Sequence, residues 1–284
     1  MVFNNNLLMG AAAAASGGAV ATWTPKGAIW LDRGSAQYLS RTPSSASDRK
    51  TWTFSVWCKR GALGHTDDAT IFGAGNTGTG YYNNIAFPDT GDSDEDKLYC
   101  AAQPAASTSY GRITDAIFRD VTAWYHMVIV LDTTQAVDDN RIQIYVNGVL
   151  AAQSDYYTGP PPEDQQWAVN NNVAHVIGKY CEVAQYYDGY LSEIILLDGY
   201  AGLPSDFGTE DSNGVWIPKD PTTIVTDNKG TNGFWLDFAD SADLGNDVSG
   251  NNHDFTATSM DADNWSYDRP ADDSDTKTGN IAVW

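Results

Sequence analysis

Basic residues are scarce in this chain. Its 284 residues include 16 Lys and Arg against 37 Asp and Glu, for a net charge of −21. A strongly acidic surface repels the phosphates of nucleic acids and of anionic lipids. We therefore expect no nucleic-acid partner and no membrane insertion. The same acidic charge is compatible with binding of divalent cations. It is equally compatible with a role in solubility alone.

Paired cysteines are missing. The three cysteines, Cys58, Cys100 and Cys181, have spacings that fit neither a disulfide framework nor a zinc site. Cys58 lies within an apolar strand pattern and is expected to be a small core residue. This usage favours folding in a reducing cytosol.

Long apolar runs are also absent. In residues 1–22 a short apolar stretch leads into five alanines, and the Gly17-Gly18 pair ends the run before it reaches a membrane-spanning length. No Lys or Arg precedes Lys26, so the basic start of a signal peptide is missing. We interpret residues 1–22 as an assembly arm that orders against a larger particle, with a disordered tail as the alternative. Its anchoring side chains would be Phe3, Leu7, Leu8 and Met9.

Helical periodicity is rare, whereas 26 glycines and many Asn and Asp residues separate short apolar runs. The clearest region is Trp124 to Gln153. Within it, Trp124 to Asp132 is apolar, Arg141 to Val146 alternates, and Asn147-Gly148 is a strong hairpin signal. Such a meander needs a second sheet against its apolar face. We therefore predict an all-β, antiparallel sandwich.

Other segments show the same strand pattern. They are 28–32, 37–42, 51–59, 69–75, 82–87, 97–103, 111–118, 173–180 and 186–200. In 51–59, the even-numbered residues from Trp52 to Cys58 share one face, which we expect to be core. The other face is polar except for Trp57. That pattern is typical of a shallow binding face, or of a face beneath a covering loop.

The chain after residue 200 is rich in loops. GFWLDF at 233–238 resembles GAIWLDR at 27–33, so we predict that a second sandwich begins here and then stops. The predicted organisation is an assembly arm at 1–22, a jelly roll at 23–200, and a loop-rich extension at 201–284 with a partial second jelly-roll start.

Catalytic motifs are missing from the sequence. It contains no E-x-D-x-E run, G-x-S-x-G elbow, HExxH or P-loop. His126 and His175 lie within strand patterns and are expected to be satisfied core residues. Glu193 lies in an apolar run and is interpreted as a buried structural carboxylate bonded to loop amides. We predict no enzymatic activity, and a polysaccharide hydrolase is the least favoured alternative.

An acidic loop offers one candidate metal site. Asp92, Asp94 and Asp96 alternate as in the opening of a calcium loop. Lys97 stands where that loop needs a glycine, and no Glu follows at the required distance. A solvated acidic loop is the favoured interpretation, and a Ca²⁺ site is the alternative.

Several segments together resemble the laminin G-like, concanavalin A-like jelly roll. They are TWTFSVWCKRG, AWYHMVIVLDTT, RIQIYVNGVL and YYDGYLSEIILLDG, within residues 28–200. The resemblance implies glycan binding on a concave face or through rim loops, frequently beside Ca²⁺. Three residues match the family's D-x-SGN loop as candidate metal ligands: Asp247, Asn251 and Asp254. Trp57 and Tyr145 are candidate sugar-stacking residues, with ordinary packing as the alternative.

The arm FNNNLLMGAAAAASGG and the segment YLSRTPSSA…TWTFSVWCKRG are similar to virion proteins of marine tailed bacteriophages. That resemblance implies a tail fibre or appendage component that binds host surface glycan. It would be assembled in the bacterial cytoplasm and exposed on the particle. Its partners would be other virion proteins, met through the arm, and copies of itself, plausibly in a trimer. The alternative is a capsid decoration or head-fibre protein that stabilises the particle without recognising glycan.

Overall fold

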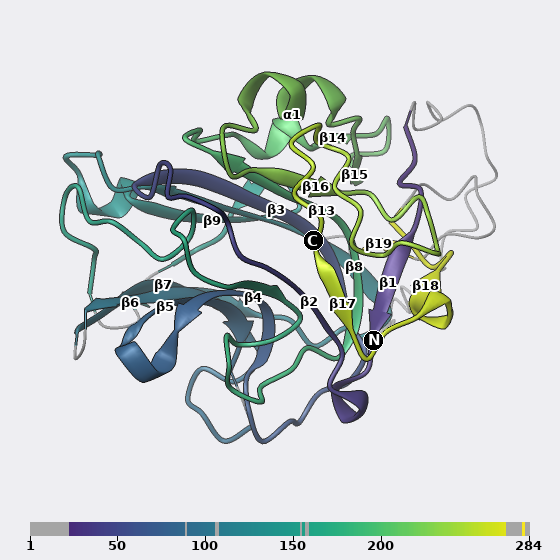
Figure 1. The fold of residues 1–284 in the computed structure, drawn as a ribbon, viewed down its shortest axis with the longest axis horizontal. Helices are drawn as coiled ribbons and strands as arrows, with labels where there is room; N and C mark the ends of the chain where they lie inside the picture. Colours follow the sequence, from purple (N-terminus) through teal and green to yellow (C-terminus); the bar gives the residue numbers. More distant parts are fainter. Residues whose placement is uncertain are drawn as a thin grey trace, which may run out of the picture.

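Two large β-sheets lie face to face in the computed structural model (Figure 1). The structure describes residues 23–88, 90–105, 108–153, 155–156, 159–270 and 280–281. The predicted arm, with Phe3, Leu7, Leu8 and Met9, lies outside these residues. Strand pairs are antiparallel apart from β19 against β8. The predicted all-β antiparallel sandwich is confirmed.

The first sheet has nine strands. Their main order is β10-β9-β8-β3-β13-β1-β18, with β16 beside β13 and β19 beside β8. The strands are β1 (Ala28–Leu31), β3 (Thr51–Arg60), β8 (Ala123–Asp132), β9 (Ile142–Val146), β10 (Val149–Leu150), β13 (Gly189–Asp198), β16 (Phe234–Leu236), β18 (Trp265–Ser266) and β19 (Asn280–Ile281).

The second sheet has eight strands in the order β11-β7-β6-β5-β4-β12-β2-β17. They are β2 (Tyr38–Arg41), β4 (Ala69–Asn76), β5 (Tyr81–Phe87), β6 (Lys97–Ala105), β7 (Thr108–Ile117), β11 (Asp155–Tyr156), β12 (His175–Ile177) and β17 (Thr256–Thr258). A separate hairpin pairs β14 (Gly208–Glu210) with β15 (Trp216–Pro218), and the described residues form one α-helix, α1 (Thr222–Asn228).

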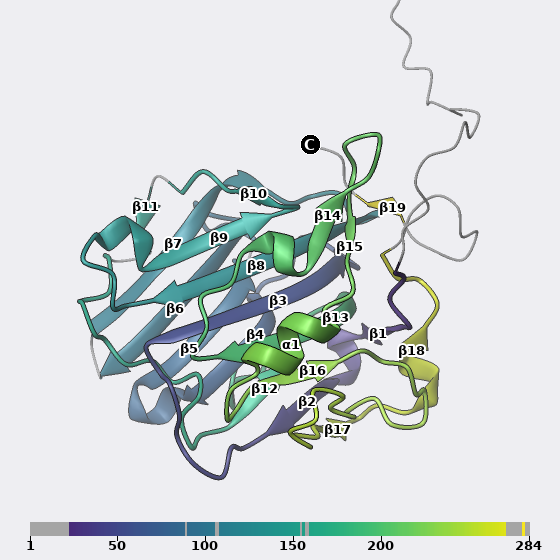
Figure 2. The ribbon, with the colours of Figure 1, turned by 90° about the horizontal axis from the view of Figure 1, so that it is seen from above.

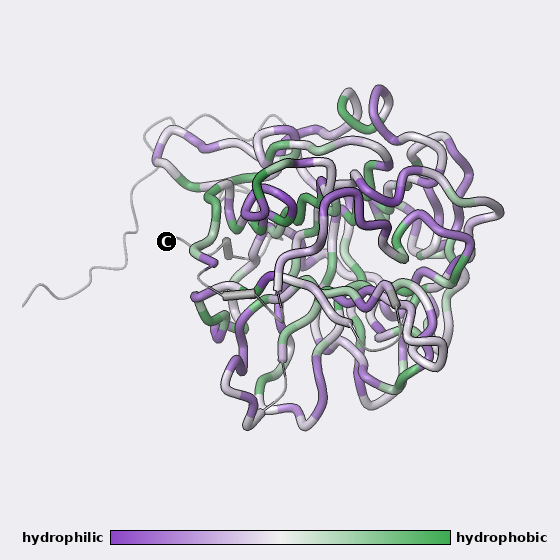
Figure 3. The backbone as a smooth tube through the Cα atoms, turned by 90° about the vertical axis from the view of Figure 1, so that its left-hand side faces the viewer, coloured by the Kyte–Doolittle hydropathy of each residue, from purple (hydrophilic) through white to green (hydrophobic). Residues whose placement is uncertain are grey.

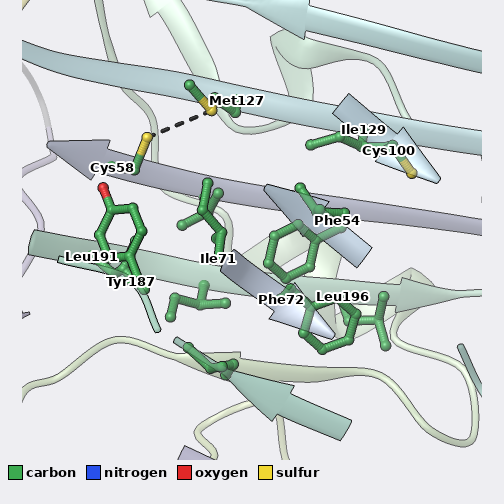
Figure 4. Close-up of a cluster of buried hydrophobic side chains, with 14 of the residues drawn as sticks. Phe54, Cys58, Ile71, Phe72, Cys100, Met127, Ile129, Tyr187, Leu191 and Leu196 are labelled. Carbon is green, nitrogen blue, oxygen red and sulfur yellow. Dashed lines mark hydrogen bonds between the residues drawn. The ribbon is translucent and has the colours of Figure 1, made fainter. Parts of the chain in front are cut away.

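The main core fills the space between the two sheets. Phe54 of β3 stacks on Phe72 of β4 with ring centroids 4.7 Å apart (Figure 4). Beside them, Cys58 contacts the sulfur of Met127 at 3.5 Å. The face of β3 predicted to be core is therefore confirmed. Figure 3 shows the same separation along the chain, with apolar stretches mostly inside and hydrophilic stretches in the outer loops.

The meander predicted between Trp124 and Gln153 forms as strands β8, β9 and β10. Asn147 and Gly148 have φ of 47° and 82°, the left-handed pair that a type I′ turn requires. The Asn147 side chain also accepts a hydrogen bond from the backbone N–H of His126 at 2.7 Å. This hydrogen bond ties the β9–β10 turn to strand β8.

Strand β13 explains why two distant segments look alike. Ile29 of β1 pairs with Leu191, and Trp235 of β16 pairs with Ile195. The two segments therefore occupy successive halves of one edge of β13. The prediction of a second, incomplete sandwich is wrong, because β16 and β18 join the nine-stranded sheet and β17 joins the eight-stranded sheet.

Residues 201–232 cover the outer face of the nine-stranded sheet. Figures 1 and 2 show α1 and the β14–β15 hairpin lying over β8, β3 and β13. Phe207 and Val225 of this segment form a second apolar cluster with Val128, Ile195 and Trp235 of the sheet beneath. We call residues 201–232 the cover. Among the described residues, no helix is long and apolar enough to cross a membrane.

Candidate functional site

Trp57 lies under the cover. Its side chain is 1% exposed and stacks on His126, with ring centroids 4.7 Å apart and planes 20° from parallel. His126 in turn stacks on Trp216 of β15 at 6.1 Å. The prediction that Trp57 contacts a sugar is wrong for this structure, because an indole sealed between protein groups presents no face to a ligand. The alternative interpretation of this face, that a segment of the chain covers it, describes the structure.

His126 and Ser55 form a buried pair that resembles a nucleophile with its base. Ser55 Oγ lies 2.9 Å from His126 Nε2. However, the Trp216 indole N–H donates to His126 Nδ1 at 3.0 Å. An indole nitrogen only donates, so the histidine proton must sit on Nε2 and point at the serine.

This tautomer cannot take a proton from Ser55. Burial also lowers the pKa of His126 to about 3, so the ring stays neutral. Both side chains lie at 1% exposure or less. The pair is therefore a hydrogen-bonded core element, and the prediction that His126 is satisfied in the core is confirmed. His175 is likewise buried, bonded through both ring nitrogens to the backbone of Asn170 and Val173.

Glu193 is the other titratable group beneath the cover. It sits in a β-bulge of β13 with φ of 49° and is 3% exposed. Its Oε2 accepts the indole N–H of Trp235 at 2.6 Å, while Oε1 has no protein partner. Burial raises the pKa of Glu193 well above its ordinary value. The predicted burial is confirmed, but the partner is an indole rather than loop amides.

The space beside Glu193 is too small for a substrate. A cavity of about 10 Å³ is bounded by Glu193, Ser55 and Trp57, among others. That is roughly the room a single water molecule needs. We therefore assign the whole cluster beneath the cover a structural role.

The D-x-SGN loop is closed by its own hydrogen bonds. Asp247 Oδ1 accepts from the backbone N–H groups of Trp235 and Ser249, both at 2.9 Å. Its Oδ2 accepts from the Ser249 hydroxyl at 2.9 Å and the His253 N–H at 2.8 Å. Asn251 donates through its amide to two backbone carbonyls, and Asp254 accepts the N–H of Asp247.

These three residues do not fit a Ca²⁺ site. Calcium needs several free oxygen ligands around one point, whereas the Asp247 oxygens are occupied and Asn251 turns N–H groups inward. Among the described residues, no group of three or more His, Cys, Asp and Glu side chains is placed to hold a metal ion. The loop instead fastens β16 to the sandwich.

The acidic loop at 92–96 does not assemble a metal site either. Asp96 is 2% exposed and bonds to Arg60 and Arg119, each at 2.6 Å. Burial raises the pKa of Asp96, but the hydrogen bonds from Arg119 and Arg60 outweigh it and hold the pKa below its ordinary value. Asp94 pairs with Lys97 at 2.8 Å, and Asp92 is exposed. The guanidinium groups of Arg60 and Arg119 occupy the position around Asp96 that a metal ion would need.

Tyr145 lies at the margin of the cover. It is half-buried against the apolar cluster, and its hydroxyl donates to Gln143 at 2.9 Å. Its role as a sugar contact stays a prediction.

The outer face of the eight-stranded sheet carries a pocket that the sequence did not indicate. Its volume is about 140 Å³. It is lined by Asp68, Tyr82, Asn84, Tyr99, Ala101, Ala102, Ser109, Tyr180 and Gln185. Pairing of β5 with β6 sets Asn84 opposite Ala101, whose small side chain leaves the strand surface low at this point. We call this the sheet pocket.

A short loop builds one wall of the sheet pocket. The backbones of Lys179 and Tyr186 form an isolated antiparallel β-bridge, so residues 178–187 make a tight hairpin-like loop. Within it the Tyr180 N–H donates to the Gln185 carbonyl at 2.9 Å. This brings Tyr180 edge-to-face against Tyr82, with ring centroids 5.4 Å apart and planes at 82°. Two aromatic rings at a right angle thus flank a polar floor.

Asn84 holds an unpaired acceptor in this pocket. Its Nδ2 donates to the Tyr99 hydroxyl at 2.5 Å, and that hydroxyl donates to Asp68 Oδ2 at 2.6 Å. A carboxylate only accepts, so the Tyr99 proton points at Asp68 and Asn84 must supply its amide N–H. Asn84 Oδ1 is left without a protein partner, although the residue is 2% exposed. Such an orphan costs roughly 1–3 kcal/mol unless water or a ligand satisfies it.

One sequence feature could have pointed to part of this site. YYNNIAF places two asparagines inside an otherwise apolar strand. Asn83 faces inward, and its Oδ1 accepts hydrogen bonds from the backbone N–H groups of Ala168 and Val169. Asn84 faces the pocket. Alternation shows that one of the two must point outward. It does not show that Tyr180, about a hundred residues later, closes the pocket over it.

The model of the concanavalin A-like lectin/glucanases superfamily matches residues 33–199, more than half of the chain. The chain belongs to this superfamily. In this superfamily member the matched region supplies both faces of the main core, and strands from beyond residue 200 complete both sheets. A comparison with curated proteins finds no match.

Solved structures with a similar fold include several from animals and bacteria. A SAP-like pentraxin from Limulus polyphemus is 15% identical, with a TM-score of 0.40 over 60% of this chain and 74% of its own. Domain 4 of AbnA, an extracellular arabinanase from Geobacillus stearothermophilus, is 20% identical, with 0.45 over 67% and 79%. Mouse laminin alpha1 domains LG4-5 are 9% identical, with 0.41 over 73% and 46%. These similarities concern the fold.

Proposed function

We propose that this protein is a glycan-binding structural protein of a virion, and that the sheet pocket receives the glycan. The observation that carries the proposal is the orphan oxygen of Asn84 on the floor of a pocket flanked by Tyr82 and Tyr180. Sugars pair C–H faces with aromatic rings and hydroxyls with buried polar groups, and this pocket offers both.

The pocket acts by binding, without catalysis. Hydrolysis of a glycosidic bond by the usual route needs two carboxyl groups facing each other across the scissile bond. Among the described residues that line the sheet pocket, Asp68 is the single carboxylate. Each copy would bind weakly, and several copies on one particle would bind a repetitive surface polymer tightly through avidity.

The virion role rests on the sequence resemblance of the arm and of the segment around 38–61. In this proposal the arm at 1–22 contacts other virion proteins or neighbouring copies, plausibly in a homotrimer, and the sandwich faces outward on the particle. Deleting residues 1–22 should abolish incorporation into particles and leave the sandwich folded. Incorporation of the deleted chain at normal levels would remove the assembly role of the arm.

Glycan binding is tested with the full chain on immobilised host surface polysaccharide. Replacing Tyr180 by Ala should weaken retention roughly 2- to 10-fold, the worth of one aromatic contact of ~0.5–1.5 kcal/mol. Tyr267→Ala, which removes an exposed tyrosine outside the sheet pocket, is the matched control and should leave retention unchanged. If wild-type protein is not retained, while particles lacking it lose stability, the protein is a capsid decoration protein instead.

A further inference from the structure

One wall of the sheet pocket is held in place by a glutamate that lies outside the pocket. We infer that Glu182 is a positioning residue for glycan binding. Its carboxylate fixes residues 178–187, which we call the wall loop, so that the Tyr180 ring stands against Tyr82. Glu182 is exposed and is not among the described residues that line the pocket. This inference rests on the proposed function, because it names what shapes the same pocket before a glycan arrives.

The wall loop lies directly on strand β4. A Cβ atom added to Gly73 of β4 would lie 2.9 Å from the Cys181 nitrogen and 3.0 Å from the Lys179 carbonyl oxygen. A larger residue at this position would therefore push the loop away from the sheet. The loop backbone rests beside the pocket in this way, and the Tyr180 ring meets the Tyr82 ring edge-to-face.

The backbone of the wall loop is not in the conformation that the local chain prefers. Cys181 directly follows Tyr180 and has φ of 44°, in the left-handed region that residues with a side chain adopt at a cost. Such a conformation persists only where surrounding contacts hold it. The next residue after Cys181 is Glu182, so a contact made by Glu182 acts on the strained position itself.

Glu182 makes two hydrogen bonds to another segment of the chain. Its Oε1 accepts the Thr77 hydroxyl at 2.7 Å and the Gly78 backbone N–H at 3.0 Å. Burial raises the pKa of Glu182, but the hydrogen bonds from Thr77 and Gly78 outweigh it and hold the pKa below its ordinary value. The carboxylate is therefore ionised at neutral pH. Hydrogen bonds to an ionised acceptor are stronger than those between neutral groups.

These hydrogen bonds join the two segments that carry the aromatic rings. Thr77 and Gly78 lie in the short 3₁₀ turn Thr77–Thr79 between β4 and β5, and Tyr82 is the second residue of β5. Tyr180 comes two residues before Glu182. The carboxylate thus ties the segment before one ring to the segment after the other. Without this tie the Tyr180 ring must be ordered when the sugar binds, and that ordering costs affinity.

The test compares retention of full-chain variants on immobilised host surface polysaccharide. Glu182→Ala should weaken retention roughly 2- to 10-fold, and no more than Tyr180→Ala, because it acts through that ring. Glu182→Gln keeps an oxygen for both donors and should recover at least about half of the loss. Glu95→Ala is the matched control, since Glu95 also accepts from a threonine hydroxyl and a glycine N–H but is not among the described residues of the lining. It should leave retention unchanged.

Two further readouts separate positioning from a general structural role. In a Tyr180→Ala background, Glu182→Ala should cause no further loss of retention, because the ring through which it acts is gone. The nuclear Overhauser effect between the rings of Tyr82 and Tyr180 should weaken in Glu182→Ala and persist in Glu182→Gln. The midpoint of thermal unfolding of Glu182→Ala should stay within about 2 °C of wild type, as expected for an exposed residue. Thr77→Val removes one donor from the other segment and gives the same test if Glu182→Ala folds poorly.

The outcomes distinguish the two proposals. Retention that Glu182→Ala leaves unchanged would overturn the positioning inference while glycan binding stands. A further loss in the Tyr180→Ala background would also overturn it, since Glu182 would then act by another route. Absence of wild-type retention on any polysaccharide would instead remove the proposed function. In that case the Overhauser effect between the two rings would still decide whether Glu182 positions Tyr180.

Discussion

The two outer faces of this sandwich carry similar polar and aromatic residues, but one face is covered by a later segment of the chain and the other has an open pocket. The nine-stranded sheet presents Trp57, His126 and Ser55, and all three are buried beneath the cover. The eight-stranded sheet presents Tyr82, Asn84 and Tyr99, and a pocket stays among them. Polar and aromatic side chains on a strand therefore do not identify a binding face by themselves. What decides is whether a later segment of the chain satisfies their hydrogen bonds.

The strongest test of the sealed face is removal of its central ring. Trp57→Ala should lower the free energy of unfolding by ~3–5 kcal/mol, as for other large aromatic residues removed from a core. Trp30→Ala is the matched control, since Trp30 is 39% exposed and should cost far less. Urea unfolding of both variants measures the contrast. Equal losses would mean that the cover does not seal Trp57 in solution.

Acid should open the same face. The pKa of His126 is lowered by burial to about 3 from 6.5, so the folded ring stays neutral while the unfolded ring takes up a proton. Its contribution is therefore present above pH 6.5 and lost as pH falls toward 3, at roughly 1.4 kcal/mol per pH unit. His126→Gln should show a shallower loss between pH 6.5 and pH 4 in unfolding experiments. His175, whose pKa burial lowers to about 4, gives a similar acid loss in both proteins. Identical slopes would contradict the assignment.

Glu193 should act in the opposite sense. Its pKa is raised by burial, so its contribution is fully present below pH 4.5 and is lost as pH rises toward the folded pKa. Glu193→Gln keeps an oxygen for the Trp235 indole and should be the more stable protein at pH 8, by roughly 1–3 kcal/mol. At pH 4 the two should differ little. Stability curves with the same pH dependence would show that Glu193 titrates normally.

The smallest expected effect concerns the margin of the cover. Tyr145→Phe removes the hydroxyl that bonds to Gln143 and should change the free energy of unfolding by less than about 1 kcal/mol. Retention on glycan should stay at the wild-type level, measured on the same polysaccharide as Tyr180→Ala. A loss equal to that of Tyr180→Ala would return the binding site to the nine-stranded sheet.

The parts of the fold that depend on local pattern were predictable. Alternation placed Phe54 in the core, and Asn147-Gly148 fixed a hairpin, because both signals act over a few residues. A covering loop over Trp57 was one of two alternatives, but the segment that forms it was not predictable, since the ring that packs over His126 comes from Trp216, far along the chain. The resemblance between GFWLDF and GAIWLDR was real but indicated a shared edge of β13 rather than a second sandwich.

The sites show the same limit. Asp247 and Asn251 match a metal-binding pattern letter by letter, yet a carboxylate that accepts four hydrogen bonds has no lone pair left for a cation. The sheet pocket depends on the Tyr99 hydroxyl pointing at Asp68, a detail of geometry that no linear pattern contains.

The cover also has a consequence for biosynthesis. Strands β3, β8 and β13 leave the ribosome before residues 201–232 are synthesised, so Val128, Ile195 and their neighbours are exposed to water in the nascent chain. The first strand meanwhile waits for Leu191, and then for Trp265, before its edges are paired. Nascent chains with such unpaired edges and apolar faces are prone to aggregate. A gene truncated near codon 200 would encode most of the sandwich, yet we expect it to yield insoluble protein, because the cover and strands β16 to β18 are then missing.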